Sequence, residues 1–189
     1  DVGNYSVTNQ STATGNIVPK TLTATASASN KVYDGDNTAI TTLTLSGLIG
    51  SETLDATNNT STFNNKNVGT GKSVTVNSIT LANGTNGGLA ANYSISPGQT
   101  DTANITKKAL TVSGITASNK TYDGNATSTL NTSSVLYSGL VPGDVFNGTY
   151  TGAFSDKNAG VNKTVTITPS YTGADVSNYS VNDHADVTA

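Results

Sequence analysis

The sequence predicts an all-β protein that consists of two tandem small β-sandwich-like domains, arranged end to end as a rod. Composition is the first observation. Of the 189 residues, 34 are Thr, 21 Ser, 23 Asn and 19 Gly, whereas the chain has one Glu and no Met or Arg. Thr favours pleated strands, and Asn and Gly favour the turns between them. The second observation is apolar alternation at period two in several short stretches, and the third is an internal repeat.

The repeat is clearest in the stretch Asn-Lys-Val-Tyr-Asp-Gly at residues 30–35, which returns as Asn-Lys-Thr-Tyr-Asp-Gly at residues 119–124. Asn-Tyr-Ser occurs three times, beginning at residues 4, 92 and 178. These spacings predict three segments. They are the C-terminal strand or strands of a preceding repeat (1–18), a complete repeat (19–106, called repeat 1) and a second repeat (107–189, called repeat 2). We therefore expect the chain to be a piece of a longer array.

Within each repeat, the alternation predicts the same series of strands. In repeat 1 they cover residues 22–26, 39–45, 60–63 and 74–76. In repeat 2 they cover residues 110–113, 134–137, 147–154 and 165–167. The Asn-Tyr-Ser strand closes each unit. The fourth strands should face the core through Val74, Val76, Val165 and Ile167.

Two spacings make this prediction more specific. The opening Leu and the motif Tyr are 11 residues apart in repeat 1 (Leu22 and Tyr33) and 12 apart in repeat 2 (Leu110 and Tyr122). One extra residue predicts a bulge or a looser bend. The junction at residues 106–108 has no Gly/Ser/Pro-rich spacer, which predicts a restricted orientation between the repeats. A β-grasp-like sheet is the alternative fold, although no convincing amphipathic helix is present.

The repeated blocks carry a family resemblance. They are Tyr-Asp-Gly at 33–35 and 122–124, Ser-Gly-Leu at 46–48 and 138–140, Lys-Asn-x-Gly…Lys-x-Val-Thr at 66–75 and 157–166, and Asn-Tyr-Ser. An acidic residue, Glu52 or Asp144, follows each Ser-Gly-Leu block. This pattern resembles the YDG domain of bacterial adhesins and the related glycine-rich MBG repeats. The resemblance implies tandem domains in large filamentous-haemagglutinin-type proteins at the Gram-negative cell surface. It implies adhesion or stalk architecture, and no catalytic residues.

Charge and composition exclude several classes of function. The net charge is −3 and nine Lys residues are scattered without any Arg, so the chain lacks a basic stripe for nucleic acid. No apolar run approaches the roughly 18 residues of a membrane span. The absence of Cys excludes disulfides and thiolate metal sites. Cys-free, Thr- and Asn-rich repeats suit an extracellular location.

The conspicuous motif residues are interpreted as structural. Asp-Gly supplies a turn with positive φ, and the Tyr packs beneath it. The structural motif residues are Tyr33, Asp34, Gly35, Tyr122, Asp123, Gly124, Tyr93 and Tyr179. The competing interpretation is a site for a cation or a sugar hydroxyl. Asp34, Asp36 and Asn37 resemble a calcium loop, but the EF-hand spacing is absent. We therefore predict no cofactor, with Ca²⁺ as the alternative.

The inventory of reactive side chains predicts no enzyme. His184 is the only histidine, and it has no Cys or second His to form a triad or zinc site with. Lys66 and Lys157 recur in Lys-Asn blocks and are the candidates for an isopeptide crosslink. That crosslink also needs a neighbouring buried acid.

The expected function is a stalk that projects a distal adhesive tip in adhesion or biofilm formation, at the bacterial surface. The partners expected are neighbouring repeats of the same chain. The alternative is a module that binds surface glycans or proteins directly. Its candidate contacts are tyrosines of repeat 2 without counterparts in repeat 1, namely Tyr137, Tyr150 and Tyr171.

Overall fold

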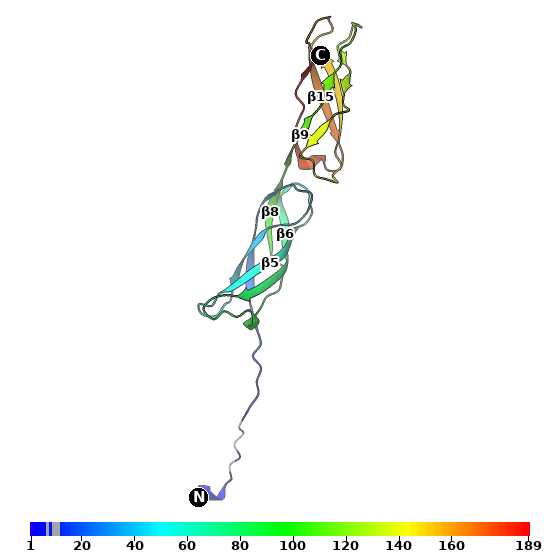
Figure 1. Ribbon diagram of the computed structural model, residues 1–189. Helices are drawn as coiled ribbons and strands as arrows, with labels where there is room; N and C mark the ends of the chain where they lie inside the picture. The colour runs from blue at the N-terminus through cyan, green and yellow to red at the C-terminus, as the bar shows by residue number, and fades with distance from the viewer. Residues whose placement is uncertain (7, 9–11) are drawn as a thin grey trace.

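The computed structural model describes residues 1–6, 8 and 12–189 and contains two elongated β-domains, one for each repeat. Figure 1 shows the domains end to end, with the C-terminus in the upper domain and the N-terminal segment running away below the lower one. The predicted rod of two all-β domains is confirmed.

Repeat 1 consists of two small sheets. The larger has the order β3 (Lys31–Val32), β8 (Thr100–Thr106), β6 (Gly69–Asn83) and β5 (Leu54–Phe63). Facing it are the pair β2 (Thr23–Ala28) and β4 (Thr41–Ser46) and the parallel pair β1 (Lys20–Thr21) and β7 (Tyr93–Ser94). The short 3-10 helix η2 (Ala90–Asn92) leads into β7. Val74 and Val76 of β6 are fully buried, as predicted.

Repeat 2 has the same plan. One sheet has the order β11 (Thr127–Ser128), β14 (Asn147–Phe154), β15 (Thr164–Thr172) and β17 (Val187–Thr188). The other has the order β13 (Leu136–Ser138), β9 (Lys108–Ser113) and β16 (Tyr179–Asn182), and β10 (Thr116–Ala117) pairs with β12 (Leu130–Asn131). The 3-10 helix η3 (Val176–Asn178) precedes β16.

A single apolar core lies between the sheets of repeat 2. Leu110 and Val112 of β9 are buried in one cluster with Phe146 and with Ile167 of β15. Ile167 and Val165 face inward, as predicted. In the described part of the chain the only helices are 3-10 turns of three residues, so the β-grasp alternative has no helix to support it. Each repeat is a small β-sandwich.

Strand positions agree with the predictions, whereas some strand lengths do not. In repeat 1, β5 begins at Leu54 and β6 extends to Asn83, far beyond the predicted residues 60–63 and 74–76. The added length is a two-stranded ribbon whose register shifts between Thr57 and Ser61. Leu54 and Ala56 in β5 and Ile79 and Leu81 in β6 alternate at period two, a signal that the predicted bounds left out. Backbone pairing continues along both strands through the shift in register.

The extra residue of repeat 2 lies at a bend, as predicted. Gly114 follows β9 with φ +86°, and a Cβ at this position would lie 2.0 Å from the Ser134 carbonyl oxygen. Glycine therefore permits both the conformation and the close backbone approach. The bend also directs Ile115 into the core, where it is 1% exposed.

The described part of residues 1–18 forms only the 3-10 helix η1 (Val2–Asn4) and no strand. Tyr5, in the first Asn-Tyr-Ser copy, is exposed. The assignment of this segment to a preceding repeat stays a prediction, since a strand needs a paired neighbour. Residues 7 and 9–11 lie outside the described residues.

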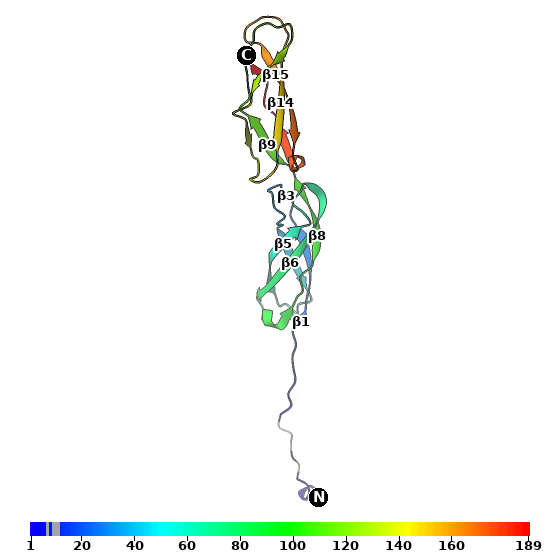
Figure 2. The same cartoon turned by 90° about the vertical axis from the view of Figure 1, so that its right-hand side faces the viewer.

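The two repeats are connected almost without a linker. Strand β8 ends at Thr106 and β9 begins at Lys108, so Lys107 alone separates them. Figure 2 shows the chain passing directly from β8 into the upper domain near β9. Buried residues of both repeats belong to one cluster, which includes Tyr33 and Phe63 of repeat 1 with Phe146 and Tyr179 of repeat 2. The cores therefore meet at the junction.

Candidate functional site

The most elaborate polar arrangement in the described chain lies where the repeats meet, and Tyr33 is at its centre. Strand β3 pairs in parallel with the end of β8, and the Tyr33 N–H donates to the Thr106 carbonyl at 2.9 Å. This pairing holds Tyr33 at the tip of repeat 1, beside the crossing chain. Gly35 then turns the backbone with φ +90°. The Tyr33 side chain is 1% exposed.

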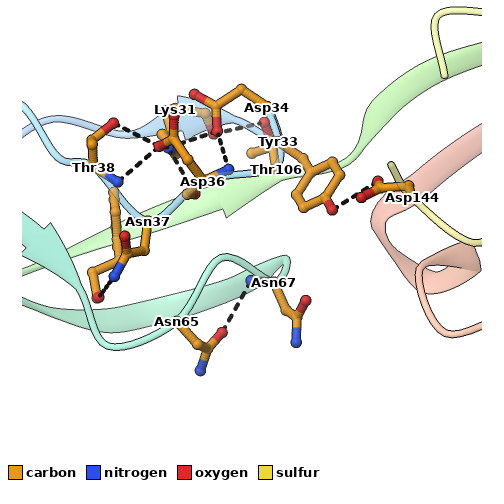
Figure 3. Close-up of polar contacts among 11 residues, drawn as sticks. Lys31, Tyr33, Asp34, Asp36, Asn37, Thr38, Asn65, Asn67, Thr106 and Asp144 are labelled. Atoms are coloured by element: carbon orange, nitrogen blue, oxygen red, sulfur yellow. Dashed lines mark hydrogen bonds and ion pairs between the residues drawn. The ribbon is translucent and has the colours of Figure 1, made fainter. Parts of the chain in front are cut away.

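The Tyr33 side chain contacts repeat 2 across the junction. Its hydroxyl donates to Oδ2 of Asp144 at 2.8 Å, as Figure 3 shows, and its ring packs edge-on against Tyr179 with centroids 5.6 Å apart. Tyr179 donates to the same Oδ2 at 2.6 Å. The Tyr179 oxygen also accepts the Val141 N–H at 2.9 Å. The Asp144 side chain is only 3% exposed, so two hydroxyls and a lysine replace its water.

Lys66 of repeat 1 forms ion pairs with two aspartates of repeat 2. Its ammonium lies 3.1 Å from Oδ1 of Asp144 and 3.1 Å from Oδ1 of Asp175. The other oxygen of Asp175 accepts the Val145 N–H at 2.9 Å. The Lys66 ammonium is also 5.8 Å from the centre of the Tyr33 ring. One cation from repeat 1 therefore bridges two carboxylates from repeat 2.

Asn178 completes the contact beside the aromatic pair. Its side-chain oxygen accepts the Val68 N–H at 3.0 Å, and its amide nitrogen donates to Oδ1 of Asn67 at 3.3 Å. Asn178 is 1% exposed. Gly35 packs so closely that a Cβ would lie 2.7 Å from Cγ1 of Val141. We call these contacts of Tyr33, Gly35 and residues 66–68 with Val141, Asp144, Asp175, Asn178 and Tyr179 the joint.

Electrostatics in the joint favours the charged Lys–Asp arrangement. Burial alone would raise the pKa of Asp144, but hydrogen bonds from Tyr179, Tyr33 and Lys66 outweigh burial and lower it. The Tyr33 hydroxyl and the two carboxylates raise the pKa of Lys66 well above its ordinary value. Burial and the hydrogen bond to Asp144 raise the pKa of Tyr179 to about 12. At neutral pH the joint therefore holds Lys66 as an ammonium, Asp144 as a carboxylate and Tyr179 as a neutral phenol.

This charge state argues against an isopeptide crosslink at Lys66. Amide formation needs an uncharged amine as nucleophile, and the raised pKa keeps Lys66 protonated. Lys66 pairs with aspartates across the joint, and its counterpart Lys157 is exposed at the far end of repeat 2. The arrangement can fix an orientation between domains, and it presents no activated nucleophile.

The other motif residues lie at the two outer ends of the rod. At the far end, Tyr122 is 62% exposed, Gly124 has φ +84° and Asp123 pairs with Lys120 at 2.8 Å. At the near end, Tyr93 donates to Oε2 of Glu52 and accepts the Ile49 N–H at 3.1 Å. Tyr93 and Glu52 therefore have the same arrangement at the near end that Tyr179 and Asp144 have at the joint. Each repeat therefore carries both halves of a joint.

A lysine ammonium occupies the oxygen cluster that resembled a calcium loop. Nζ of Lys31 lies 2.7 Å from Oδ1 of Asp34, 2.8 Å from Oδ1 of Asp36 and 3.0 Å from the Asp36 carbonyl. Hydrogen bonds from Lys31 and Thr38 lower the pKa of Asp36 to about 2. Figure 3 shows these groups around the turn that follows β3. In repeat 2, Lys120 bonds in the same way to Asp123 and Asn125. The ammonium thus takes the position that a metal ion would need.

The structure also places the repeat 2 tyrosines and His184, which the sequence had singled out. Tyr137, Tyr150 and Tyr171, the candidate contacts of a binding module, are half-buried and not exposed. The Tyr137 and Tyr171 rings pack on Phe146, and the Tyr150 ring packs edge-on against Tyr171. The Tyr150 and Tyr137 hydroxyls lie 3.2 Å apart, and Tyr171 donates to Asp183 at 2.6 Å. The signal missed was period two: Tyr171 is in phase with Val165 and Ile167 on β15, and Tyr150 is in phase with Phe154 on β14. His184 contacts only its neighbour's carbonyl, with Nδ1 2.6 Å from Ala185 O.

The described residues contain no group of three His, Cys, Asp or Glu side chains placed to hold a metal ion. None of their helices has the length and hydropathy needed to cross a bilayer.

Fold and joint together define a tandem array of all-β repeats with a built head-to-tail contact. The family model for the YDG domain matches residues 18–103 and again residues 106–189. These matches cover most of the sequence, and the chain belongs to the YDG domain family. Searches of curated proteins and of solved structures gave no match.

Sequence reasoning identified the motif tyrosines but not their partners across the joint. Asp144 was visible as an acid that recurs after Ser-Gly-Leu, and Lys66 as part of a recurring block. Asp175 recurs as Asp1, three residues before Asn4, but Leu89 stands at the corresponding position of repeat 1, so the acid is not common to every copy. Contact between residues 111 positions apart, such as Tyr33 and Asp144, follows only from how the domains stack.

Proposed function

We propose that these YDG domains are non-enzymatic spacer repeats in the stalk of a secreted or surface-anchored bacterial adhesin. In this role they hold a distal binding tip away from the cell during adhesion or biofilm formation. The location proposed is the outside of a Gram-negative outer membrane. The partners of each repeat are the repeats before and after it in the chain.

The joint is the single observation that carries this proposal. A spacer must hold its two ends far apart. A flexible chain of domains does this poorly, because its end-to-end distance grows only with the square root of its length. Here one residue, Lys107, separates the sheets, and Tyr33 is buried against the next domain. Charge pairing by Lys66 and the hydrogen bonds of Asn178 oppose rotation about the connection. These features support a stiff unit that can be added in series.

Small-angle X-ray scattering tests the mechanical part. The wild-type chain should give an elongated, two-lobed profile with a narrow distribution of interdomain distances. The variant Tyr33→Ala/Lys66→Ala should broaden that distribution, since it removes the ring and the bridging cation. The matched variant Tyr122→Ala/Lys157→Ala alters the same positions of repeat 2 and should leave the profile unchanged. A compact wild-type particle, or equal breadth in all three proteins, contradicts the proposal.

An exchange experiment in the native host tests the biological part. The two domains are replaced, in the full-length protein, by an unrelated rigid spacer of equal length. Adhesion should be retained if the domains act as a spacer, and lost when they are deleted without replacement. Loss of adhesion in the exchanged protein, at equal surface display, would favour direct binding by the domains.

A further inference from the structure

An early strand and a late strand of each repeat lie side by side and run in the same direction. In repeat 2 these are β9 and β16, which pair residues 108–111 with residues 179–182 in parallel. In repeat 1 they are β1 and β7, which pair residues 20–21 with residues 93–94 in parallel. Parallel strands need a crossover connection, and here most of the repeat forms it. The pairing therefore ties the beginning of each folded unit to its end.

The parallel ladder of repeat 2 is the longer one, because the chain of repeat 1 leaves its first strand sooner. The Gly98 N–H already donates to the Val76 carbonyl of β6 at 2.9 Å, and Gly98 has φ +110°. This conformation suits glycine, and His184 stands at the same position of repeat 2. There, pairing with β15 begins only at Val187. Strand β16 therefore stays beside β9 for four residues, whereas β7 has two.

Backbone hydrogen bonds hold the ladder together. In repeat 1 the Ser94 carbonyl accepts the Leu22 N–H at 2.8 Å. Ser180 is the counterpart of Ser94 in sequence and in register. Alternate residues of a strand bond the same neighbour. Ser180 and Asn182 are therefore the residues of β16 that bond β9.

Side chains on both strands oppose sliding of one strand along the other. Leu110 and Val112 of β9 are 0% and 2% exposed. On β16, the Tyr179 hydroxyl donates to Asp144, and Val181 packs against the apolar core. Displacement along the strand axis would withdraw these side chains from their contacts.

Tension along the rod loads this ladder along its strands. Repeat 1 pulls on β9 through Lys107, next to the first residue of the strand. Strand β16 leads away from repeat 1, and the load leaves it through its last residue, Asn182, toward β17. Figures 1 and 2 show the strands of repeat 2 running along the long axis of the rod. Tension therefore pulls β9 and β16 past each other in opposite directions.

We propose that the β9–β16 ladder is a force-bearing clamp that resists extension of repeat 2 along the rod. Its resistance depends on direction. A load that slides the strands is shared by all the bonds between them, whereas a load that separates their first residues, Lys108 and Tyr179, breaks one bond after another. The use of such a clamp in the cell rests on the stalk function proposed above, since a stalk under tension must keep its folded length.

Single-molecule force spectroscopy with two attachment geometries tests the clamp. The chain has no Cys, so two introduced cysteines are unique attachment points. Lys107→Cys with Ala185→Cys pulls the start of β9 against the end of β16 and slides the strands. Lys107→Cys with Ser177→Cys pulls the starts of both strands apart. All three positions are exposed, and repeat 1 lies outside both pulled segments.

At the same loading rate, the sliding geometry should need an unfolding force several times higher than the separating geometry. The two proteins share Lys107→Cys and otherwise differ only at exposed positions, so urea denaturation should give them equal free energies of unfolding. The difference in force then reports the direction of the load. Equal forces, or a higher force in the separating geometry, would overturn the proposal.

Asn182→Pro, introduced into each attachment variant, tests the ladder itself. Proline removes the N–H of the last ladder residue. The unfolding force should fall in the sliding geometry and stay unchanged in the separating geometry, because separation begins at Tyr179, the opposite end of the ladder. An equal proportional fall in both geometries would mean that the proline weakens the whole domain, and would overturn the clamp. Failure of these tests leaves the scattering test of the stalk unaffected, since scattering measures the joint without load.

Discussion

The two Tyr-Asp-Gly copies have almost the same local structure and opposite surroundings. In both, a Gly with positive φ makes the turn and a Lys ammonium lies among the oxygens of the turn. That ammonium also lies about equally far from a Phe ring, at 5.8 Å in repeat 1 and 5.9 Å in repeat 2. Yet Tyr33 is 1% exposed and Tyr122 is 62% exposed. The turn is therefore a local property, and burial of its tyrosine depends on a neighbouring domain.

The opposite ends of the repeats differ in the same way. Asn178 is buried under residues 67–68, while its counterpart Asn92 is exposed. Val141 is half-buried against Gly35, while Ile49 is exposed. The tyrosine–carboxylate pair is nevertheless formed at both ends. Each end is thus preorganised before it meets a partner, which lowers the entropy cost of forming the joint.

The largest contrast should come from the two tyrosines. Tyr33→Ala removes a buried ring and its hydrogen bond, and should lower the free energy of unfolding by about 3–5 kcal/mol. Tyr122→Ala removes an exposed ring and should change it by no more than about 0.5 kcal/mol. Urea denaturation followed by far-UV circular dichroism measures both. Equal losses would mean that Tyr33 stabilises its own turn and not the joint.

Substitution of the acidic residues at the two ends, Asp144 and Glu52, should give a smaller difference in the free energy of unfolding. Asp144→Ala leaves the hydroxyls of Tyr33 and Tyr179 without their acceptor, and should cost about 3 kcal/mol. Glu52→Ala removes a partner of Tyr93 alone and should cost clearly less, since water can reach that end. The same denaturation experiment compares them. A larger loss for Glu52→Ala would contradict the assignment of Asp144 to the joint.

The turn glycines provide a smaller, purely steric contrast. Alanine at Gly35 or at Gly124 meets the same positive-φ strain, about 1–2 kcal/mol. At Gly35 the new Cβ would also press on Cγ1 of Val141, whereas at Gly124 it meets nothing within 4 Å. Val is stiff at χ1, so Gly35→Ala should cost about 1 kcal/mol more than Gly124→Ala. Thermal unfolding of the two single variants gives this difference directly.

The smallest expected effect is on how the free energy of unfolding depends on pH. The pKa of Asp144 is lowered in the folded state, so its contribution to stability is present above the ordinary value of 3.8 and is lost as pH falls below it. The pKa of Tyr179 is raised from 10.0 to about 12, so its contribution is lost as pH rises through that range.

Comparison of unfolding curves across pH tests this assignment. The variant Asp144→Ala should show a shallower loss of stability at acid pH than the wild type, and Tyr179→Phe a shallower loss at alkaline pH. An acid limb with the same slope in Asp144→Ala and the wild type would place the titrating group elsewhere.

Much of the fold could be predicted from local pattern. Val74, Val76, Val165 and Ile167 alternate at period two and face the core, because a half-buried strand imposes that alternation. The ribbon of β5 and β6 carries the same signal in Leu54, Ala56, Ile79 and Leu81, but the predicted strands stopped short of it because the shift in register between Thr57 and Ser61 interrupts the alternation. The tyrosines of repeat 2 were interpreted as exposed for a different reason. Tyr137, Tyr150 and Tyr171 have no counterparts in repeat 1, yet they pack partly inward, and Tyr171 is in phase with the core residues Val165 and Ile167 of β15.

The sequence by itself determined where the core strands lie along each unit, the positive-φ turn of Tyr-Asp-Gly and the tandem organisation. These properties depend on residues close together in the chain or on repetition, and both can be recognised in the amino-acid sequence. Only the tertiary structure decided what the tyrosine of the motif does. Asp144 is 111 residues from Tyr33 in sequence and 2.8 Å from it in space. That contact exists because two rigid sandwiches joined by Lys107 have few ways to stack, and one of them places this tyrosine over that acid.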